Sequence, residues 1–597
     1  MKKISVSIFA FFAISIIFFT GCGSKNLISK KSYKEIQFEK EKSLILTKLS
    51  HQNKLDNKIS IGIVGNPKNL NPFLAYDKSS MTILNSIYDP LYYNSYNDKT
   101  ENFDFVLAKN AVLSKDKKSF KLTLNDNITW HDNKKLTIED LLYTLDIIKN
   151  SNTVYDKLLT KDEKLSYKKI SENTIEFKSD FISPSFIYQL GKVRIVPKHI
   201  YLNHEKDKLL DSSFLIGNGP FKYQSHEYDF IKVIRNNNYY KEKANLDELK
   251  FLLVNHKTST RFSLLNFEVQ LGYTQAKDEN GFVNTPFVYN SIDSGEIHGI
   301  LLNTNSENVK NEKTRKAINM LFSKPDMTGL YGTSNTVQEA NSIFSNITKY
   351  KINKSLFYKY SLADSGELLM KAKENNKNFS IKMPYIVDPG EPQDNYSVKL
   401  EEIFRSINVK FDLEPLFAEE FDETLKNFSN SKYDFLMFDY VSGEDPDDTS
   451  KYFASNGSMN YNGYKNEEID KLYIKAYKEK DELRKQEFYN KIQEIILNSQ
   501  YIVPAAYVKN SITYDDRLKG ISKENLDSDT LVKHLNKISV EELDSSTFDL
   551  KKYDINLENT ENTLKKNTEA VINNRKKLLK IYQEKKVIPL FTKILLK

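Results

Sequence analysis

The only cysteine of this 597-residue chain, Cys22, has neighbours that predict covalent modification of its thiol. It follows the small residues Thr20 and Gly21 and an apolar run over 4–19, which begins behind two lysines. A charged start, a short apolar run and small residues before a cysteine are typical of a signal peptide that is cleaved once the thiol is acylated, for example with palmitate. The sequence therefore predicts a signal peptide over 1–21 and a lipid-modified Cys22. The alternative is an uncleaved anchor with an incidental cysteine, although the run is short for a bilayer span.

A second group of chemically active side chains lies in the segment 441–448, which is rich in carboxylates. Its acids are Glu444, Asp445, Asp447 and Asp448. Closely spaced acids suggest a calcium loop, but Ser450 stands where such a loop needs its turn glycine and Asn456 where it needs a bidentate acid. The plain alternative is a solvated acidic loop.

Residue patterns that support catalysis are not found in the sequence. There is no Gly-x-Ser-x-Gly nucleophile elbow and no Gly-x4-Gly-Lys-Ser/Thr phosphate loop, and Cys22 is consumed by the predicted lipid. His199 and His204 are five residues apart, which does not match helical zinc-ligand spacing, so we interpret them as surface histidines. We therefore expect no enzyme activity, no metal site and no cofactor.

Strands and helices alternate in the segments that would position these residues. Apolar patterns predict strands over 59–64, 120–124, 173–178, 231–234 and 248–254. Apolar positions three and four apart predict helices over 137–148, 314–322, 397–406 and 467–497. The mixture indicates an α/β fold.

Composition limits the classes of protein to which the chain can belong. With 39% hydrophobic residues it can bury a large core, in two or three domains. No later apolar stretch approaches the roughly 20 residues that cross a bilayer, so the chain cannot form a channel by itself. The formal charge of +7 is concentrated in residues 561–597, where ten basic residues face three acids. A nucleic-acid-binding protein needs a basic patch on its folded body. The placement of the excess charge in a terminal segment therefore argues against nucleic-acid binding.

Several motifs, in order along the chain, resemble those of the family 5 extracellular solute-binding proteins, which deliver oligopeptides, dipeptides and some other solutes to ABC importers. The resemblance covers about 59–521. It rests on Asn69-Leu-Asn-Pro72, Ile87-Tyr-Asp-Pro-Leu91, Leu107-Ala108, Asp116 through Trp130-His-Asp132, Leu136-Thr-Ile-Glu-Asp140, Gly217-Asn-Gly-Pro-Phe221, Arg235-Asn-Asn-Asn-Tyr-Tyr240, Leu302-Asn303, Thr314-Arg-Lys-Ala-Ile-Asn319, Tyr433-Asp434, Glu444-Asp-Pro446, Asn460-Tyr-Asn-Gly-Tyr464 and Asn466 through Asp470.

The chain also departs from the family pattern. Asp439-Tyr440 stands where many members have Gly-Trp, and the segment 266–271 differs from the usual crossing into the second lobe. The stretch 384–389 offers no basic residue where dipeptide binders place an arginine. The missing base argues against a preference for dipeptides.

The resemblance implies a two-lobed fold of the periplasmic-binding-protein type, of the large class with an extra subdomain, and a cleft between the lobes. We expect a tether over 22–57, a first lobe over 58–265 and 502–525 with an extra subdomain at about 77–189, and a second lobe over 266–501. The chain would pass from the first lobe to the second near Asn266 and return near Tyr501, and these two connections would form a hinge. Residues 526–597 would form a polar and helical extension, in which Leu557, Leu564, Val571 and Leu578 recur every seven residues.

The resemblance also implies where a ligand binds. Family members place an acid for the α-ammonium group of a peptide just before the late proline, which nominates Glu444 or, failing that, Asp445. Tyr440, Trp130 and Tyr461 are candidates for the cleft walls, although single aromatic residues are more often core. Asn71, from the opening turn, completes the set of candidate ligand residues.

The resulting expectation is a monomeric substrate-binding subunit of an ABC importer, anchored by its lipid to the outer face of the cytoplasmic membrane. It would pass peptides, most simply oligopeptides, to separate permease and ATPase subunits. Alternatives are a surface interaction protein or a receptor for signalling peptides that has kept the fold without import, or a binder of another solute such as a nickel chelate.

Overall fold

The computed structural model of the protein describes residues 54–541 with short gaps. The gaps are 68, 97–101, 152, 156–157, 203–214, 255–256, 276–277, 279–281, 283–284, 322–335, 353–359, 377–378 and 387–392. All described residues belong to one compact unit. The predicted signal peptide, Cys22, most of the tether and the end of the extension lie outside the described residues. Within the described part, no helix has the length and apolar character needed to cross a membrane.

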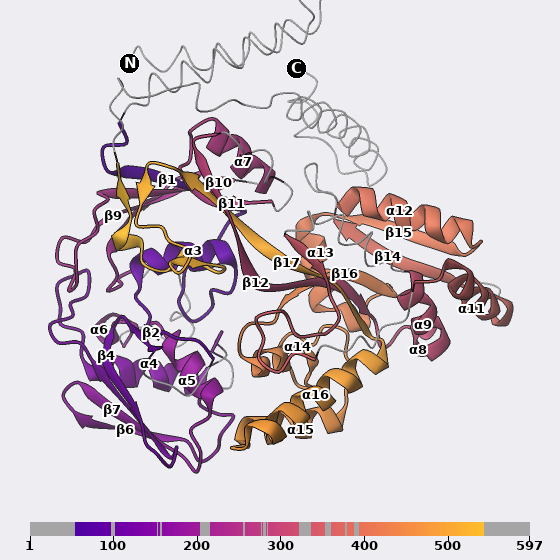
Figure 1. The fold of residues 1–597 in the computed structure, drawn as a ribbon, viewed down its shortest axis with the longest axis horizontal. Coiled ribbons are helices and arrows are strands. Elements are labelled where there is room, and N and C mark those ends of the chain that lie inside the picture. The colour runs from indigo at the N-terminus through magenta and orange to yellow at the C-terminus, as the bar shows by residue number, and fades with distance from the viewer. Residues whose placement is uncertain are drawn as a thin grey trace, which may run out of the picture. The chain divides into compact units, whose positions relative to one another are not determined.

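A nine-stranded mixed sheet is the main framework (Figure 1). In spatial order it contains β16 (Phe435–Val441), β12 (Phe287–Leu302), β17 (Ile502–Asp515), β11 (Leu271–Thr274), β1 (Lys58–Val64), β10 (Glu248–Val254), β9 (Phe230–Arg235) and β8 (Phe221–His226), with β13 (Val337–Glu339) also paired to β17. β1 runs parallel to β10 and β11, whereas β12 and β17 are antiparallel. The strands predicted over 59–64, 231–234 and 248–254 are confirmed as β1, β9 and β10.

A second sheet of four antiparallel strands belongs to the segment expected as an extra subdomain. Its order is β4 (Ala108–Leu113), β5 (Ser119–Leu124), β7 (Thr174–Lys178) and β6 (Ser166–Ser171). Alternate residues of β5, Phe120 and Leu122, are fully buried, as its period-two pattern predicts. The helix α4 (Ile138–Asn150) begins where Asp140 accepts a hydrogen bond from the Thr137 backbone N–H at 2.8 Å, which satisfies a free donor of the first turn.

The first of three hydrophobic cores joins this four-stranded sheet to one end of the main sheet, and we call the part built on it the first lobe. It includes α3 (Lys78–Ile87), α5 (Pro184–Gly191) and α6 (Lys198–Tyr201). The glycine turn noted in the sequence packs directly on the end of α3. A Cβ atom on Gly217 would lie 1.9 Å from the Ile87 carbonyl oxygen, so only glycine fits there.

The other two cores form the second lobe. Its elements are α8 (Glu307–Lys310), α9 (Glu312–Leu321), α11 (Leu362–Asn375), β14 (Ser380–Ile386), α12 (Gln393–Ser406), β15 (Lys410–Leu416), α13 (Ala418–Lys426), α14 (Ser450–Phe453), α15 (Glu467–Lys478) and α16 (Glu482–Ser499). The helix predicted over 467–497 is in fact two helices. Glu479 is extended, and the Asp481 carboxylate caps α16 by accepting a hydrogen bond from the Arg484 backbone N–H at 2.9 Å.

The two lobes are joined within the main sheet by β12 and β17, which lie side by side in Figure 1. Ile292 on β12 still packs against the first core, and Ile297 belongs to the second lobe. Between them the pairing shifts at a β-bulge that contains Gly295 at φ +71°. The crossing therefore lies later than the expected Asn266, because Leu271 and Tyr273 on β11 still pack in the first core.

Residues 526–541, expected as the start of a polar extension, pack into the first lobe. They form β19 (Leu526–Asp527), β20 (Leu531–Val532) and β21 (Ser539–Val540), the last paired with β18 (Leu518–Lys519). Leu531 and Val532 are fully buried. Two-residue strands leave no periodic pattern in a sequence, which is why the segment looked polar and irregular.

Candidate functional site

The acidic loop, defined as residues 444–448, follows β16 and contacts the first lobe. Asp445 has no exposed surface, and one of its carboxylate oxygens accepts a hydrogen bond from the Ser185 hydroxyl of α5 at 2.5 Å. The other accepts from the Asp447 backbone N–H at 3.0 Å. Burial, aided by the neighbouring charges of Asp448 and Asp447, raises the pKa of Asp445 to about 8. Asp445 therefore binds a proton far more readily than an ordinary aspartate does.

Glu444, the first choice for an ammonium partner, is also engaged by protein groups. Its carboxylate accepts a hydrogen bond from the Tyr96 backbone N–H at 2.7 Å. Its carbonyl oxygen accepts from the Lys349 backbone N–H at 3.1 Å. Both nominated acids thus hold groups of the protein itself in this structure.

The remaining acids of the loop contact the same part of the first lobe. Asp447 forms an ion pair with Lys161, and both side chains are largely buried. Asp448 accepts a hydrogen bond from the Gln189 side chain at the end of α5. The acidic loop is therefore a contact between the lobes that combines one ion pair with several hydrogen bonds.

The predicted aromatic residues lie mainly in the cores. Tyr440 is 3% exposed, donates its hydroxyl hydrogen to the Ile343 carbonyl at 3.0 Å and packs among other aromatic rings of the second lobe. Trp130 is 1% exposed in the first core. Tyr461 is half-buried and meets the Phe438 ring edge-on, with 6.2 Å between ring centroids.

Asn71 is also buried, at 1% exposure, and shapes its own turn by accepting a hydrogen bond from the Phe73 backbone N–H at 2.8 Å. The structure thus brings Glu444 and Asp445 together at the lobe contact. It places Tyr440 and Tyr461 in the second lobe and leaves Trp130 and Asn71 in the first. A shared ligand contact for all six stays a prediction.

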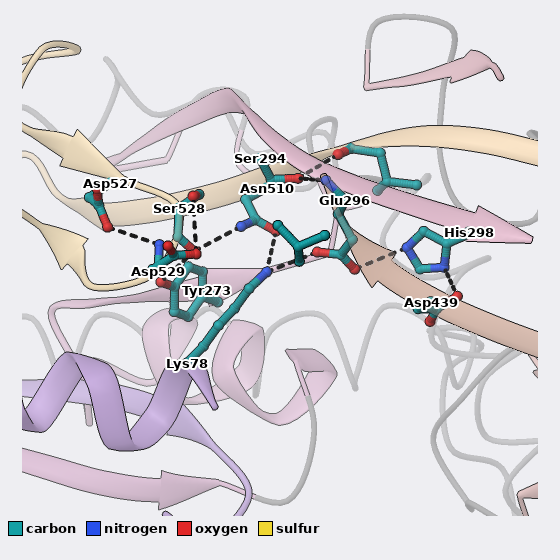
Figure 2. A network of polar contacts seen from close by, with 12 residues as sticks. Lys78, Tyr273, Ser294, Glu296, His298, Asp439, Asn510, Asp527, Ser528 and Asp529 are labelled. Carbon is teal, nitrogen blue, oxygen red and sulfur yellow. Dashed lines mark hydrogen bonds and ion pairs between the residues drawn. The ribbon is translucent and has the colours of Figure 1, made fainter. Parts of the chain in front are cut away.

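A polar network that sequence reasoning missed spans the crossing strands (Figure 2). The Lys78 ammonium of α3 lies 2.8 Å from the Glu296 carboxylate of β12 and 3.0 Å from the Asn510 side-chain oxygen of β17. His298 lies between Glu296, at 3.0 Å, and Asp439 of β16, at 2.7 Å. The network links the first lobe to three neighbouring strands at the bulge.

Histidine 298 carries a positive charge in this network. Burial, the largest influence, lowers the pKa of His298, but the carboxylates of Asp439 and Glu296 outweigh it and raise the pKa to about 9. The imidazole is therefore protonated at neutral pH, and two acids on adjacent strands share one buried cation. Only the pairing of β12 with β16 brings His298 beside Asp439, so no sequence pattern marks this site.

The network continues to the turn between β19 and β20. Asn510 and Tyr273 both donate hydrogen bonds to the Ser528 carbonyl oxygen, each at 3.0 Å. The Asp527 carboxylate in turn accepts from the Asp529 backbone N–H at 2.9 Å. This turn is thus fixed against the crossing strands, as Figure 2 shows.

The described residues hold no group of three or more histidine, cysteine, aspartate or glutamate side chains arranged to bind a metal ion. What the site offers instead is a set of carboxylates, ammonium groups and tyrosines on two lobes, with β12 and β17 between them. The architecture is thus a mixed α/β fold of two lobes joined by a pair of long antiparallel strands.

Comparison with known proteins defines the family. Residues 104–462, more than half of the chain, match the model of the bacterial extracellular solute-binding proteins, family 5. The chain belongs to this family. It is 22% identical over 484 residues to the dipeptide-binding protein DppE of Bacillus subtilis, covering 76% of this chain and 87% of that protein.

Two solved structures show the same fold. The ABC transporter substrate-binding protein CtaP of Listeria monocytogenes superposes with a TM-score of 0.70 at 24% identity, covering 81% of this chain and 99% of that one. The oligopeptide-binding protein AppA of Bacillus subtilis, solved with a nonapeptide, gives a TM-score of 0.69 at 19% identity, with coverage of 81% and 99%. The predicted two-lobed α/β fold and the predicted family are confirmed.

Proposed function

We propose that this protein is the substrate-binding subunit of an ABC importer and captures peptides outside the cytoplasmic membrane. The observation that carries the proposal is membership of a solute-binding family whose relatives include a dipeptide-binding protein and an oligopeptide-binding protein. Permease and ATPase subunits would be separate proteins, and the receptor itself would act as a monomer without catalysis.

Binding would be coupled to closure of the lobes. Support comes from the acidic loop, which makes polar contacts to α5 and to Lys161 of the first lobe. A ligand that touches both lobes adds its own contacts to these and shifts the population toward the closed form. A permease that recognises both lobes together would then distinguish loaded from empty receptor.

The direct test is native mass spectrometry of residues 23–597 purified from cells, followed by denaturing analysis of what is released. A series of co-purified peptides supports the proposal. A protein that carries no peptide, and whose thermal unfolding midpoint does not rise with a random peptide pool, refutes it. A rise with a nickel–histidine chelate instead would indicate the alternative solute.

We also propose that a lipid on Cys22 holds the receptor at the outer face of the membrane. The support is the sequence before the cysteine, with its small residues at 20 and 21. Labelling with an alkyne fatty acid in a bacterial host should mark the wild-type chain in the membrane fraction. Cys22→Ser should lose both the label and the membrane association, and a label that persists on this variant would refute the assignment.

A further inference from the structure

The main sheet has a defined point at which one lobe can rotate against the other. On β12, Ile292 packs against the first core and Ile297 belongs to the second lobe, with the bulge around Gly295 between them. A bulge interrupts the regular ladder of a sheet and bends the strand. A rotation at this point would move Glu296, directly after Gly295, relative to α3 of the first lobe.

Backbone contacts of the bulge fix it to β17 and to the end of β16. The Ser294 hydroxyl donates a hydrogen bond to the Val508 carbonyl oxygen at 2.7 Å and accepts one from the Glu296 backbone N–H at 3.1 Å. The Gly295 carbonyl oxygen accepts a hydrogen bond from the Ser442 backbone N–H at 2.9 Å. The backbone of Glu296 therefore moves with the second lobe.

The side chain of Glu296 is oriented from the same side. His298 Nε2 lies 3.0 Å from Glu296 Oε1, and His298 Nδ1 lies 2.7 Å from Asp439 Oδ1 of β16. One carboxylate oxygen of Glu296 is thus held by a group of the second lobe. The other oxygen, Oε2, points toward α3, as Figure 2 shows.

Lys78, the first residue of α3, is held from the first-lobe side. Its ammonium lies 3.0 Å from the side-chain oxygen of Asn510 and 5.7 Å from the centroid of the Tyr273 ring. Asn510 pairs with Ile292, before the bulge, and donates a hydrogen bond to the Ser528 carbonyl oxygen at 3.0 Å. The position of the ammonium is therefore set by the first lobe alone.

The two charged groups meet across the bulge. Lys78 Nζ lies 2.8 Å from Glu296 Oε2, and the two side chains are 30% and 14% exposed. Partial shielding from water makes this attraction stronger than that of a fully exposed pair. The ion pair thus joins two groups that separate lobes hold in place.

We propose that the Lys78–Glu296 ion pair is a hinge latch that holds the two lobes in the arrangement of this structure, and that His298 positions Glu296 for it. Rotation at the bulge would separate the two charges. Since the latch consists of protein groups only, it would set the balance between lobe arrangements before any ligand binds. The inference therefore goes beyond the proposed function and does not depend on the nature of the ligand.

The latch would also influence affinity. When only one arrangement of a receptor is competent to bind, the apparent affinity is reduced by the fraction of molecules outside that arrangement. The latch would then strengthen the binding of every ligand by the same factor, through a mechanism that needs no contact with the ligand.

The test measures the lobe arrangement directly. Residues 23–597 contain no cysteine, because Cys22 is the only one in the chain. Lys168→Cys on β6 of the first lobe and Lys475→Cys on α15 of the second lobe change exposed residues and provide sites for a donor and an acceptor dye. Single-molecule energy transfer without peptide then gives the ratio of the lobe arrangements.

Loss of either charge should change this ratio. Lys78→Met and Glu296→Gln should each shift it away from the wild-type arrangement about five- to fiftyfold. His298→Gln should shift the ratio in the same direction. The double variant Lys78→Met, His298→Gln should shift it no further than Lys78→Met alone, because both residues act through Glu296.

A matched control separates the latch from a general loss of stability. Lys232 of β9 and Glu248 of β10 form an ion pair of 2.7 Å within the first lobe, and their side chains are 29% and 21% exposed. Lys232→Met should lower the thermal unfolding midpoint as Lys78→Met does but leave the ratio unchanged. Gln189→Ala removes a hydrogen bond to Asp448 at the lobe contact and should shift the ratio, which verifies that the dyes respond.

The outcomes decide each part of the inference. If folded Lys78→Met and Glu296→Gln keep the wild-type ratio while Gln189→Ala shifts it, the latch is refuted. A shift for Lys232→Met as large as that for Lys78→Met also refutes it. Additive effects in the double variant refute the positioning role of His298. If the predicted shifts occur in a protein that binds no peptide, the latch is supported and the peptide-binding function is refuted.

Discussion

Replacing Asp445 by asparagine tests how the acidic loop responds to pH. In the folded protein the pKa of Asp445 is raised from its ordinary 3.8 to about 8, first by burial and then by Asp448 and Asp447. The folded state thus binds its proton more tightly than the unfolded chain does. The contribution of Asp445 to stability is therefore greatest below pH 3.8 and declines as the pH rises toward 8.

The size of the effect follows from the pKa difference. Between the two pKa values, one extra bound proton in the folded state costs at most roughly 1.4 kcal/mol of stability for each pH unit. The neighbouring acids share part of this titration, so the observed slope will be smaller. Asp445→Asn has no proton to lose, and its amide can still accept from the Asp447 N–H and donate to the Ser185 hydroxyl. The variant should gain stability relative to wild type as the pH rises.

The measurement is the free energy of urea unfolding at pH 5, 6, 7 and 8 for wild type, Asp445→Asn and the exposed control Asp412→Asn. Other groups also titrate in this window. The raised pKa values of His298 and Asp89 make wild type lose stability with pH for separate reasons. The difference between variant and wild type removes their contribution. Parallel curves for the variant and wild type from pH 5 to 8 would refute the buried, protonated state of Asp445.

Three further changes test other parts of the structure. In wild type, the raised pKa of His298 contributes stability that is present below pH 6.5 and is lost as the pH rises through about 9. His298→Gln should remove this contribution and flatten the curve of unfolding free energy against pH above 6.5. An unchanged curve contradicts the paired imidazolium. Lys161→Met should lower the free energy of urea unfolding by about 3–5 kcal/mol because it leaves the buried Asp447 carboxylate without its ion-pair partner. Lys164→Met removes one member of an exposed ion pair and should cost less than about 1 kcal/mol. Equal losses for the two variants refute this difference. Gly217→Ala should lower the thermal unfolding midpoint strongly because its Cβ atom would overlap a carbonyl oxygen of α3. Gly443→Ala should have little effect. A small loss for Gly217→Ala contradicts the close packing of Gly217 against α3.

Local patterns predicted the elements that depend on local physics. The alternation in β5 and the capping of α4 by Asp140 need only residues close in sequence, and the strand and the helix both appear where the sequence predicts them. The break between α15 and α16 also depends on a local signal, the Asp481 cap, but the apolar pattern continues through it. A hydrophobic pattern alone does not show that a helix stops and restarts.

The candidate site was harder to predict because its chemistry depends on distant partners. The sequence drew attention to Glu444 and Asp445, and the structure places them at the lobe contact. Their partners Tyr96 and Ser185 are 348 and 260 residues away, and no local pattern indicates that these partners occupy them.

The place of β17 in the main sheet has a consequence for how the chain acquires its structure. This strand lies between β12 and β11 and contributes residues to the cores of both lobes. A chain made from its N-terminus has synthesised all other strands of that sheet before β17 exists. The first lobe then lacks an interior strand, and also the buried turns up to residue 541, until synthesis has passed that residue. Contacts of such long sequence separation form slowly, so the partly made first lobe must avoid aggregation while the place of β17 in its sheet is still empty.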